Sequence, residues 1–134
     1  MVNARRRGTR EDGFSLIELL VVMIIIGILA GITIPILLNQ RRSAVDASMK
    51  SDLRNAAVLV ESYRTEHASY PAAIGVIAGQ LRMDDGTDIA LSVDAGGEAF
   101  CLVATRRPGV PPGSGAWSYD SDGGGLLDLD VACS

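Results

Sequence analysis

The chain has 134 residues, of which 48% are hydrophobic, and a formal net charge of −4. This length allows at most one modest domain beside any membrane segment, which excludes a large multidomain protein. The acidic balance argues against general nucleic-acid binding, because such binding depends on many Lys and Arg contacts to phosphates.

The hydrophobic residues are concentrated in one segment, residues 14–38, whose only strongly polar side chains are Ser15, Glu18 and Thr33. About 25 helical residues are long enough to cross a hydrocarbon core of about 30 Å. We therefore predict a membrane-spanning helix over residues 14–38. A cleaved secretory signal peptide is the alternative, although its apolar part is normally only about 7–15 residues long.

Arginines on both sides of this segment bear on its orientation. Four precede the segment and two follow it: Arg5, Arg6, Arg7 and Arg10, then Arg41 and Arg42. By the positive-inside rule, the larger group predicts that the N-terminus stays in the cytoplasm and the C-terminal part lies outside. The two arginines that follow the segment weaken this bias.

One carboxylate, Glu18, lies a single helical turn inside the apolar segment. A charged side chain at the centre of a membrane helix costs about 2.5–3.5 kcal/mol on insertion scales. Glu18 is therefore a candidate functional residue, and its function requires a partner for the charge.

Residues 39–134 are predicted to complete an α+β fold. Apolar residues spaced by three or four indicate an amphipathic helix over residues 39–69, continuous with the membrane helix and ended by Pro71. Its apolar stripe consists of Val45, Met49, Leu53, Ala56, Val60 and Tyr63. We expect this helix to cover one face of a small antiparallel sheet.

The sheet is predicted within residues 88–134, after a connecting loop over residues 70–87 with at most one short helical turn. Alternating hydrophobicity and turn residues indicate four strands, at about 89–93, 100–105, 117–119 and 126–131. Cys101 and Cys133 fall in this part. An even number of cysteines in an exported small domain predicts one disulfide, and two free thiols are the alternative.

The start of the apolar segment carries a resemblance to a known family. Residues 13–22, GFSLIELLVV, combine a glycine, a phenylalanine, a glutamate one turn later and an uninterrupted apolar helix. This motif resembles the class III signal of type IV pilins and the related pseudopilins. The resemblance continues through the helix, Tyr70-Pro71 and the sheet with its late disulfide, where residues 100–102 and 117–121 are similar to strands of Gram-positive members.

The resemblance implies that residues 1–13 are a leader. A membrane aspartyl peptidase, the prepilin peptidase, is expected to cut between Gly13 and Phe14 and to N-methylate the new amine of Phe14. That amine, on a neighbouring subunit, becomes the expected partner of Glu18 and would set the register of assembly. The alternative is that Glu18 lies near the lipid headgroups and only favours the helix N-terminus through the helix dipole.

Three further residues fit a helix that packs against copies of itself. Gly27 and Gly31 form a GxxxG step, which allows close approach of helices in lipid but also occurs by chance. Pro35 removes one helical hydrogen bond, so the resemblance implies a kink or partial unwinding there. A proline that is merely tolerated in a membrane helix is the alternative.

Signals for other chemistry are weak. The sequence has no nucleophile–base pair, Walker loop or dinucleotide fingerprint, so we expect neither an enzyme nor a cofactor. Asp120, Asp122 and Asp128 faintly resemble a calcium loop, but the EF-hand spacing fails and a hairpin turn is the simpler interpretation. Arg106 and Arg107 could contact DNA phosphates if the filament serves DNA uptake, against the alternative of a solvated loop.

The leading hypothesis is thus a pilin, a structural subunit of a homo-oligomeric type IV pilus. It would be held in the bacterial cytoplasmic membrane before assembly and at the cell surface afterwards. The family implies an inner-membrane platform protein and an assembly ATPase as partners. The close alternative is a major pseudopilin of a type II secretion or competence system, and the distant one is an uncleaved, single-span binding domain.

Overall fold

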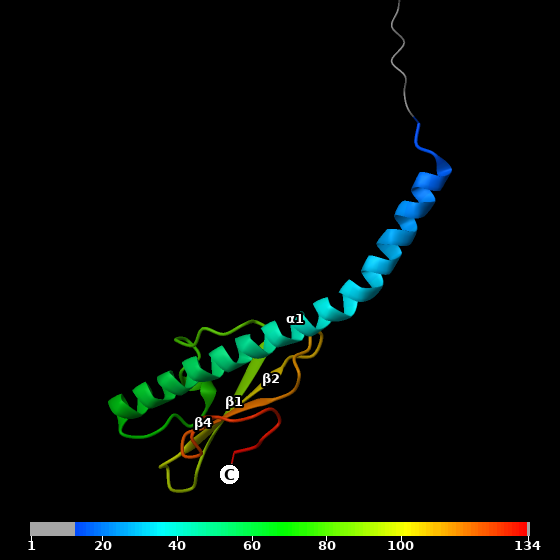
Figure 1. Cartoon of the computed structure of the whole chain (residues 1–134). Coiled ribbons are helices and arrows are strands. Elements are labelled where there is room, and N and C mark those ends of the chain that lie inside the picture. Colours follow the sequence, from blue (N-terminus) through cyan, green and yellow to red (C-terminus); the bar gives the residue numbers. More distant parts are fainter. Residues whose placement is uncertain (1–12, 134) are drawn as a thin grey trace, which may run out of the picture. The chain divides into compact units, whose positions relative to one another are not determined.

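The computed structural model describes residues 13–133 (Figure 1). In chain order it contains α1 (Leu16–His67), the short 3₁₀ helix η1 (Ile74–Val76), β1 (Thr87–Val93), β2 (Phe100–Arg106), β3 (Trp117–Asp120) and β4 (Gly125–Leu126). These elements confirm the predicted fold class, a long helix followed by a small antiparallel sheet. The predicted leader, except Gly13, lies outside the described residues.

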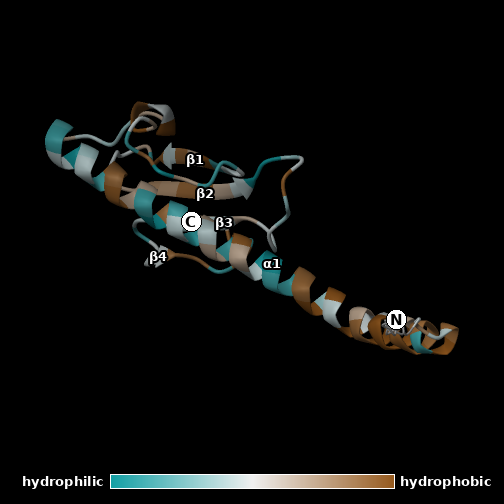
Figure 2. Ribbon diagram, turned by 90° about the horizontal axis from the view of Figure 1, so that it is seen from above, coloured by the Kyte–Doolittle hydropathy of each residue, from teal (hydrophilic) through white to brown (hydrophobic). Residues whose placement is uncertain are grey.

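The chain divides into two compact units between Leu37 and Leu38, and α1 runs through the division. In the first unit α1 is apolar on all sides (Figure 2). It contains a stretch long and apolar enough to cross a membrane, and none of that stretch is buried within the chain. This unit therefore has no core of its own.

The second unit has a core between the amphipathic part of α1 and one face of the sheet. From α1, the buried side chains are Met49, Leu53, Ala56, Ala57 and Val60; from the residue after η1 and from the sheet, they are Ile77, Ile89, Phe100, Leu102 and Ala104. Val45 and Tyr63, the ends of the predicted stripe, pack partly buried against this core. The three-or-four spacing thus identified the buried face of the helix correctly.

The sheet is antiparallel with strand order β1-β2-β3-β4, so each strand pairs with its neighbour in sequence. In the first hairpin Leu91 pairs with Leu102, which places both side chains on the face that α1 covers. Cys101 and Val103 alternate with Leu102 along β2 and therefore belong to the opposite face. The Asp94 carboxylate closes this hairpin by accepting backbone N–H groups of Glu98 (2.8 Å) and Ala99 (2.9 Å).

The first three strands lie within two residues of their predicted bounds, and the ends of the helix and of the fourth strand differ in ways that have a physical reason. The helix was expected to continue to residue 69, but α1 ends at His67 because Ala68 adopts a left-handed conformation (φ 59°). The fourth strand was expected over residues 126–131, but β4 contains only Gly125 and Leu126. The alternation there was misleading, since Leu129 and Val131 are exposed and Asp130 breaks the extended backbone with φ 57°.

Candidate functional site

The start of α1 is a reciprocal hydrogen-bonded cap. Ser15, just before the helix, accepts the backbone N–H of Ile17 at its Oγ (3.4 Å). Glu18 reaches back, and its Oε2 accepts the backbone N–H of Ser15 (2.9 Å). This arrangement is a capping box, in which two otherwise unpaired N–H groups of the first turn are satisfied. The pattern Ser-x-x-Glu at residues 15–18 is its sequence signal, which the prediction overlooked.

The cap gives Glu18 a partner within its own chain. A carboxylate at a helix N-terminus is also favoured by the helix dipole, by about 0.3–1 kcal/mol at exposed positions. In the uncut chain, Phe14 has an amide N–H rather than the free amine proposed as the partner of Glu18. The Glu18 carboxylate is therefore hydrogen bonded to Ser15 within its own chain.

Large apolar side chains surround this cap and remain exposed. Phe14 is 80% exposed, Leu16 87% and Ile17 68%. Contiguous apolar surface of this extent marks a membrane or protein interaction site. The first unit thus presents one capped carboxylate at the end of a fully apolar helical surface.

The two glycines of the GxxxG step leave open space on this surface. A Cβ atom added at Gly27 or at Gly31 would meet nothing within 4 Å, so neither glycine is required by packing within the chain. α1 continues through Pro35 without a break, so the described chain contains no unwound segment there. Because Pro35 has no N–H, the carbonyl of Gly31 has lost its usual helical donor. Gly31 therefore combines a missing side chain with a carbonyl that lacks its helical bond.

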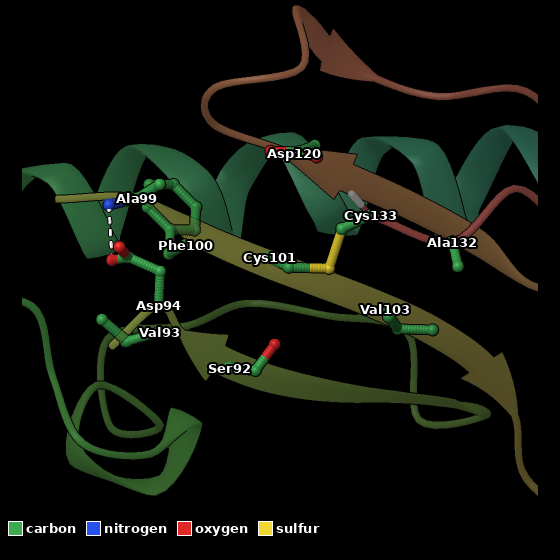
Figure 3. Close-up of a pocket in the computed structure, with 10 residues that line it drawn as sticks. All are labelled: Ser92, Val93, Asp94, Ala99, Phe100, Cys101, Val103, Asp120, Ala132 and Cys133. Carbon is green, nitrogen blue, oxygen red and sulfur yellow. Dashed lines mark hydrogen bonds between the residues drawn. A yellow bond between two sulfur atoms is a disulfide. The ribbon is translucent and has the colours of Figure 1, made fainter. Parts of the chain in front are cut away.

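The second unit is fastened at its C-terminal end by the predicted disulfide. Cys101 of β2 is bonded to Cys133, with their Cα atoms 6.1 Å apart (Figure 3). A shallow hollow beside the disulfide is lined by Ser92, Val103 and Ala132, among others. Since Cys101 belongs to the sheet face opposite α1, the end of the C-terminal segment, Ala132 and Cys133, lies at that face.

The weak calcium candidates do not form a common site. Asp120 is buried, and its Oδ1 accepts the backbone N–H groups of Asp122 and Gly123 (both 3.1 Å), which closes the turn after β3. Asp128 belongs to the C-terminal segment after β4. Within residues 13–133, no three carboxylate, histidine or cysteine side chains gather in a group that could hold a metal ion.

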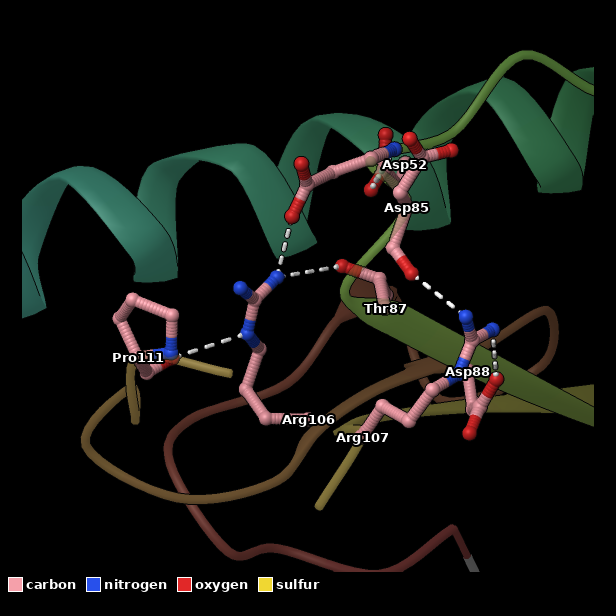
Figure 4. A network of polar contacts seen from close by, with 8 residues as sticks. Asp52, Asp85, Thr87, Asp88, Arg106, Arg107 and Pro111 are labelled. Carbon is pink, nitrogen blue, oxygen red and sulfur yellow. Dashed lines mark hydrogen bonds and ion pairs between the residues drawn. The ribbon is translucent and has the colours of Figure 1, made fainter. Parts of the chain in front are cut away.

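Arg106 and Arg107 are engaged by the protein itself (Figure 4). Arg106 forms an ion pair with Asp84 and donates to Thr87 Oγ1 (3.2 Å). Arg107 pairs with Asp88 (2.7 Å), and this hydrogen bond holds the pKa of the Asp88 carboxyl below its usual range. A DNA phosphate would therefore have to compete with two carboxylates for these guanidinium groups.

A buried carboxylate connects α1 to the loop before β3. Asp46 is 8% exposed, and it accepts hydrogen bonds from the backbone N–H (2.8 Å) and the hydroxyl (2.5 Å) of Ser114. Burial raises the pKa of Asp46, but these bonds, the Trp117 indole and the charge of Lys50 outweigh burial and lower it below its ordinary value. The Lys50 ammonium itself lies 3.6 Å from the centre of the Trp117 ring. This cluster was not predicted, because its members are far apart in sequence.

Comparisons with known proteins agree with the geometry at the start of α1. The family described as "Prokaryotic N-terminal methylation motif" matches residues 8–34. The type IV wide pilus major component PilA4 of Thermus thermophilus is 33% identical over 99 residues, covering 73% of this chain and 76% of that protein.

Secretion proteins are also similar. The type II secretion system core protein G of Dickeya chrysanthemi is 26% identical over 133 residues, covering 91% of this chain and 85% of that protein. Its counterpart in Pseudomonas aeruginosa is 32% identical over 63 residues, and the match spans only 44% of that protein. A solved type IV pilin structure from Thermus thermophilus aligns with a TM-score of 0.48 at 19% identity, covering 63% of this chain and 97% of the other.

Proposed function

The chain belongs to the type IV pilin family, and from this premise we propose that it is the structural subunit of a type IV pilus. The peptidase expected for the family would cut between Gly13 and Phe14 and methylate the amine of Phe14. Gly13 is exposed and has no side chain to hinder access to the peptide bond. The described cap begins at Ser15, so the cut falls outside it and leaves the helix N-terminus intact.

The observation that carries this proposal is the fully exposed apolar surface of α1 ending in a capped carboxylate. Subunits related by a rotation that does not close form an open filament, and a core of such helices would cover this surface. Moving an apolar helix from lipid into a core of similar helices has little hydrophobic cost in either direction. Close packing at Gly27 and Gly31 would then favour association.

Assembly would give Glu18 a second partner. We propose that its carboxylate pairs with the free amine of Phe14 on a neighbouring subunit and thereby sets the axial register. Buried ion pairs are weak contributors to net stability but can specify register. The carbonyl of Gly31, which has no donor from Pro35, marks where the helix could yield as it packs.

In this proposal, the partners and the membrane orientation of the chain are those expected for the family. The N-terminus would lie in the cytoplasm, with α1 anchored in the cytoplasmic membrane and the second unit outside. The prepilin peptidase, a platform protein and an assembly ATPase would process and move the subunit. An exterior location for the second unit agrees with its disulfide, because such bonds persist in oxidising compartments.

A major pseudopilin of a secretion or competence system is the second candidate. The match to the protein G of Dickeya chrysanthemi over 91% of this chain favours it. Both candidates use the same helix but differ in product, a long surface pilus or a short pseudopilus. Electron microscopy of material sheared from cells that produce the chain tests the choice. Long filaments lost on deletion of its gene are expected, and their absence would contradict the pilus.

A further inference from the structure

Beyond the helical core, the second unit carries two exposed patches of opposite charge. On the outer side of α1, Val58 is 69% exposed and lies between two shallow hollows. Arg54 lines one hollow together with Glu61, whose Oε1 accepts a hydrogen bond from the Tyr70 hydroxyl (3.1 Å), and Arg82 lines the other hollow. We call this surface, Arg54, Val58 and Arg82, the basic patch. Among the described residues, neither of its guanidinium groups forms a hydrogen bond or an ion pair.

The second patch lies in the C-terminal segment after β4. Leu129 is 39% exposed and Val131 44% exposed, in a segment that also carries Asp128 and Asp130. Asp130 Oδ1 accepts the backbone N–H of Ala116 (2.8 Å), whereas the Asp128 side chain has no hydrogen bond or ion pair within residues 13–133. We call residues 128–131 the acidic patch.

The two patches lie on different surfaces of the second unit. The basic patch is on the side of α1 that faces away from the sheet, since Leu53, Ala57 and Val60 on its other side are buried in the core. The acidic patch comes just before Cys133 in the chain and lies at the β3 side of the sheet, where the backbone N–H groups of Leu127 and Asp130 donate to the carbonyls of Ser118 (2.9 Å) and Ala116 (3.0 Å). Within this unit the sheet lies between the helix and the C-terminal end (Figure 1).

We infer that the basic patch of one copy receives the acidic patch of the next. Each patch has an apolar centre beside charge that the described part of the chain leaves unpaired, Arg54 and Arg82 in one and Asp128 in the other, and the two signs are complementary. A contact between different faces of identical subunits is heterologous, so it repeats in one direction and produces an open array instead of a closed dimer. This inference rests on the proposed filament and adds a specific contact between its outer units.

A photo-crosslinking experiment on the full-length chain in producing cells tests this contact. A benzophenone amino acid replaces Val58, and filaments are irradiated after co-production of isotopically light and heavy copies. The expected product is a mixed light–heavy crosslink from position 58 to residues 127–133. Filaments whose crosslinks lead to another segment, or to a different protein, would overturn the inference and leave the proposed filament standing. A wild-type chain that makes no filament would instead refute the proposed function.

Exchanging the charges of the two patches is a second test of the contact, and it remains informative if the crosslinking variant does not assemble. Arg54→Asp and Asp128→Arg should each lower filament yield about fivefold, as expected for the loss of one exposed ion pair. The double variant should return yield to within about twofold of wild type. Glu98→Arg, in the turn between β1 and β2, is the control and should assemble normally. Unchanged yields in both single variants, or a double variant no better than either, would overturn the inference.

Discussion

At the scale of single residues, Glu18 has one partner in the structure and a second one in the proposed filament. In the isolated chain its carboxylate accepts the Ser15 N–H and completes a capping box. In the proposed filament it would pair with the Phe14 amine of a neighbour. The hydrogen bond to Ser15 lowers the free-energy cost of holding a carboxylate near an apolar environment. The contact with Phe14 would form only after cleavage, because cleavage creates the free amine.

Replacing Glu18 separates capping from pairing. Glu18→Gln keeps an oxygen that can accept the Ser15 N–H but removes the charge, whereas Glu18→Val removes both. If pairing sets assembly, both variants should lower filament yield at least about tenfold, which corresponds to about 1.4 kcal/mol. The yield of sheared filaments, normalised to the subunit in the membrane, is the measurement. Normal filaments from Glu18→Val would rule out the pairing.

Asp46 allows a prediction about pH. Its folded-state pKa is lowered from an ordinary value of 3.8, so its stabilising contribution is present above that value and is lost as the pH falls through the folded-state pKa. Asp46→Ala should destabilise the second unit by about 1.5–3 kcal/mol at pH 7, because Ser114 loses hydrogen bonds to a charged group.

Thermal unfolding of the detergent-solubilised chain between pH 7 and pH 3 measures the effect. Wild type should lose stability below about pH 4, and Asp46→Asn should show a shallower loss. Part of the slope should remain, since the exposed carboxyls of Asp84, Asp88 and Asp94 also have lowered pKa values. An identical pH profile in Asp46→Asn and wild type would show that Asp46 does not contribute.

At the scale of elements, the spacing of apolar residues predicted the helix and the first strands, whose buried side chains recur at a regular interval. The stripe from Val45 to Tyr63 gave the buried side of α1, and the turn residues around Gly97 separated the first two strands. The predicted element bounds were wrong where the positive φ angle of one residue interrupts the helix or the extended backbone, as at Ala68 and Asp130. Contacts such as Asp46 with Ser114 could not be predicted, because the residues are 68 positions apart and neither has a local signal.

The disulfide gives a test at this scale. It closes a loop with a sequence separation of 32 residues, so the chain-entropy estimate gives about 3–4 kcal/mol of stabilisation. The double variant Cys101→Ser/Cys133→Ser should therefore have a melting temperature lower by more than about 10 °C. A reducing agent should lower the melting temperature of wild type and leave the double variant unchanged. Equal melting temperatures for the oxidised wild type and the double variant would contradict this account.

At the scale of the whole molecule, the chain joins two units with opposite requirements. The first, through Leu37, buries none of its membrane-length apolar stretch, and the second has its own core and a polar surface. Such a chain needs either lipid or copies of its own helix around the first unit, and water around the second. The position of the apolar residues along the chain predicted these different surroundings, whereas the proposed relation between cleavage and assembly depends on a motif of only a few residues.

In the proposed function, cutting before Phe14 converts the membrane-held chain into a filament subunit. Mass spectrometry of the N-terminal peptide from sheared filaments tests it most directly. We predict a peptide that begins at Phe14 and carries one methyl group on its α-amine. A filament subunit that still begins at Met1 or Val2 would contradict the claim.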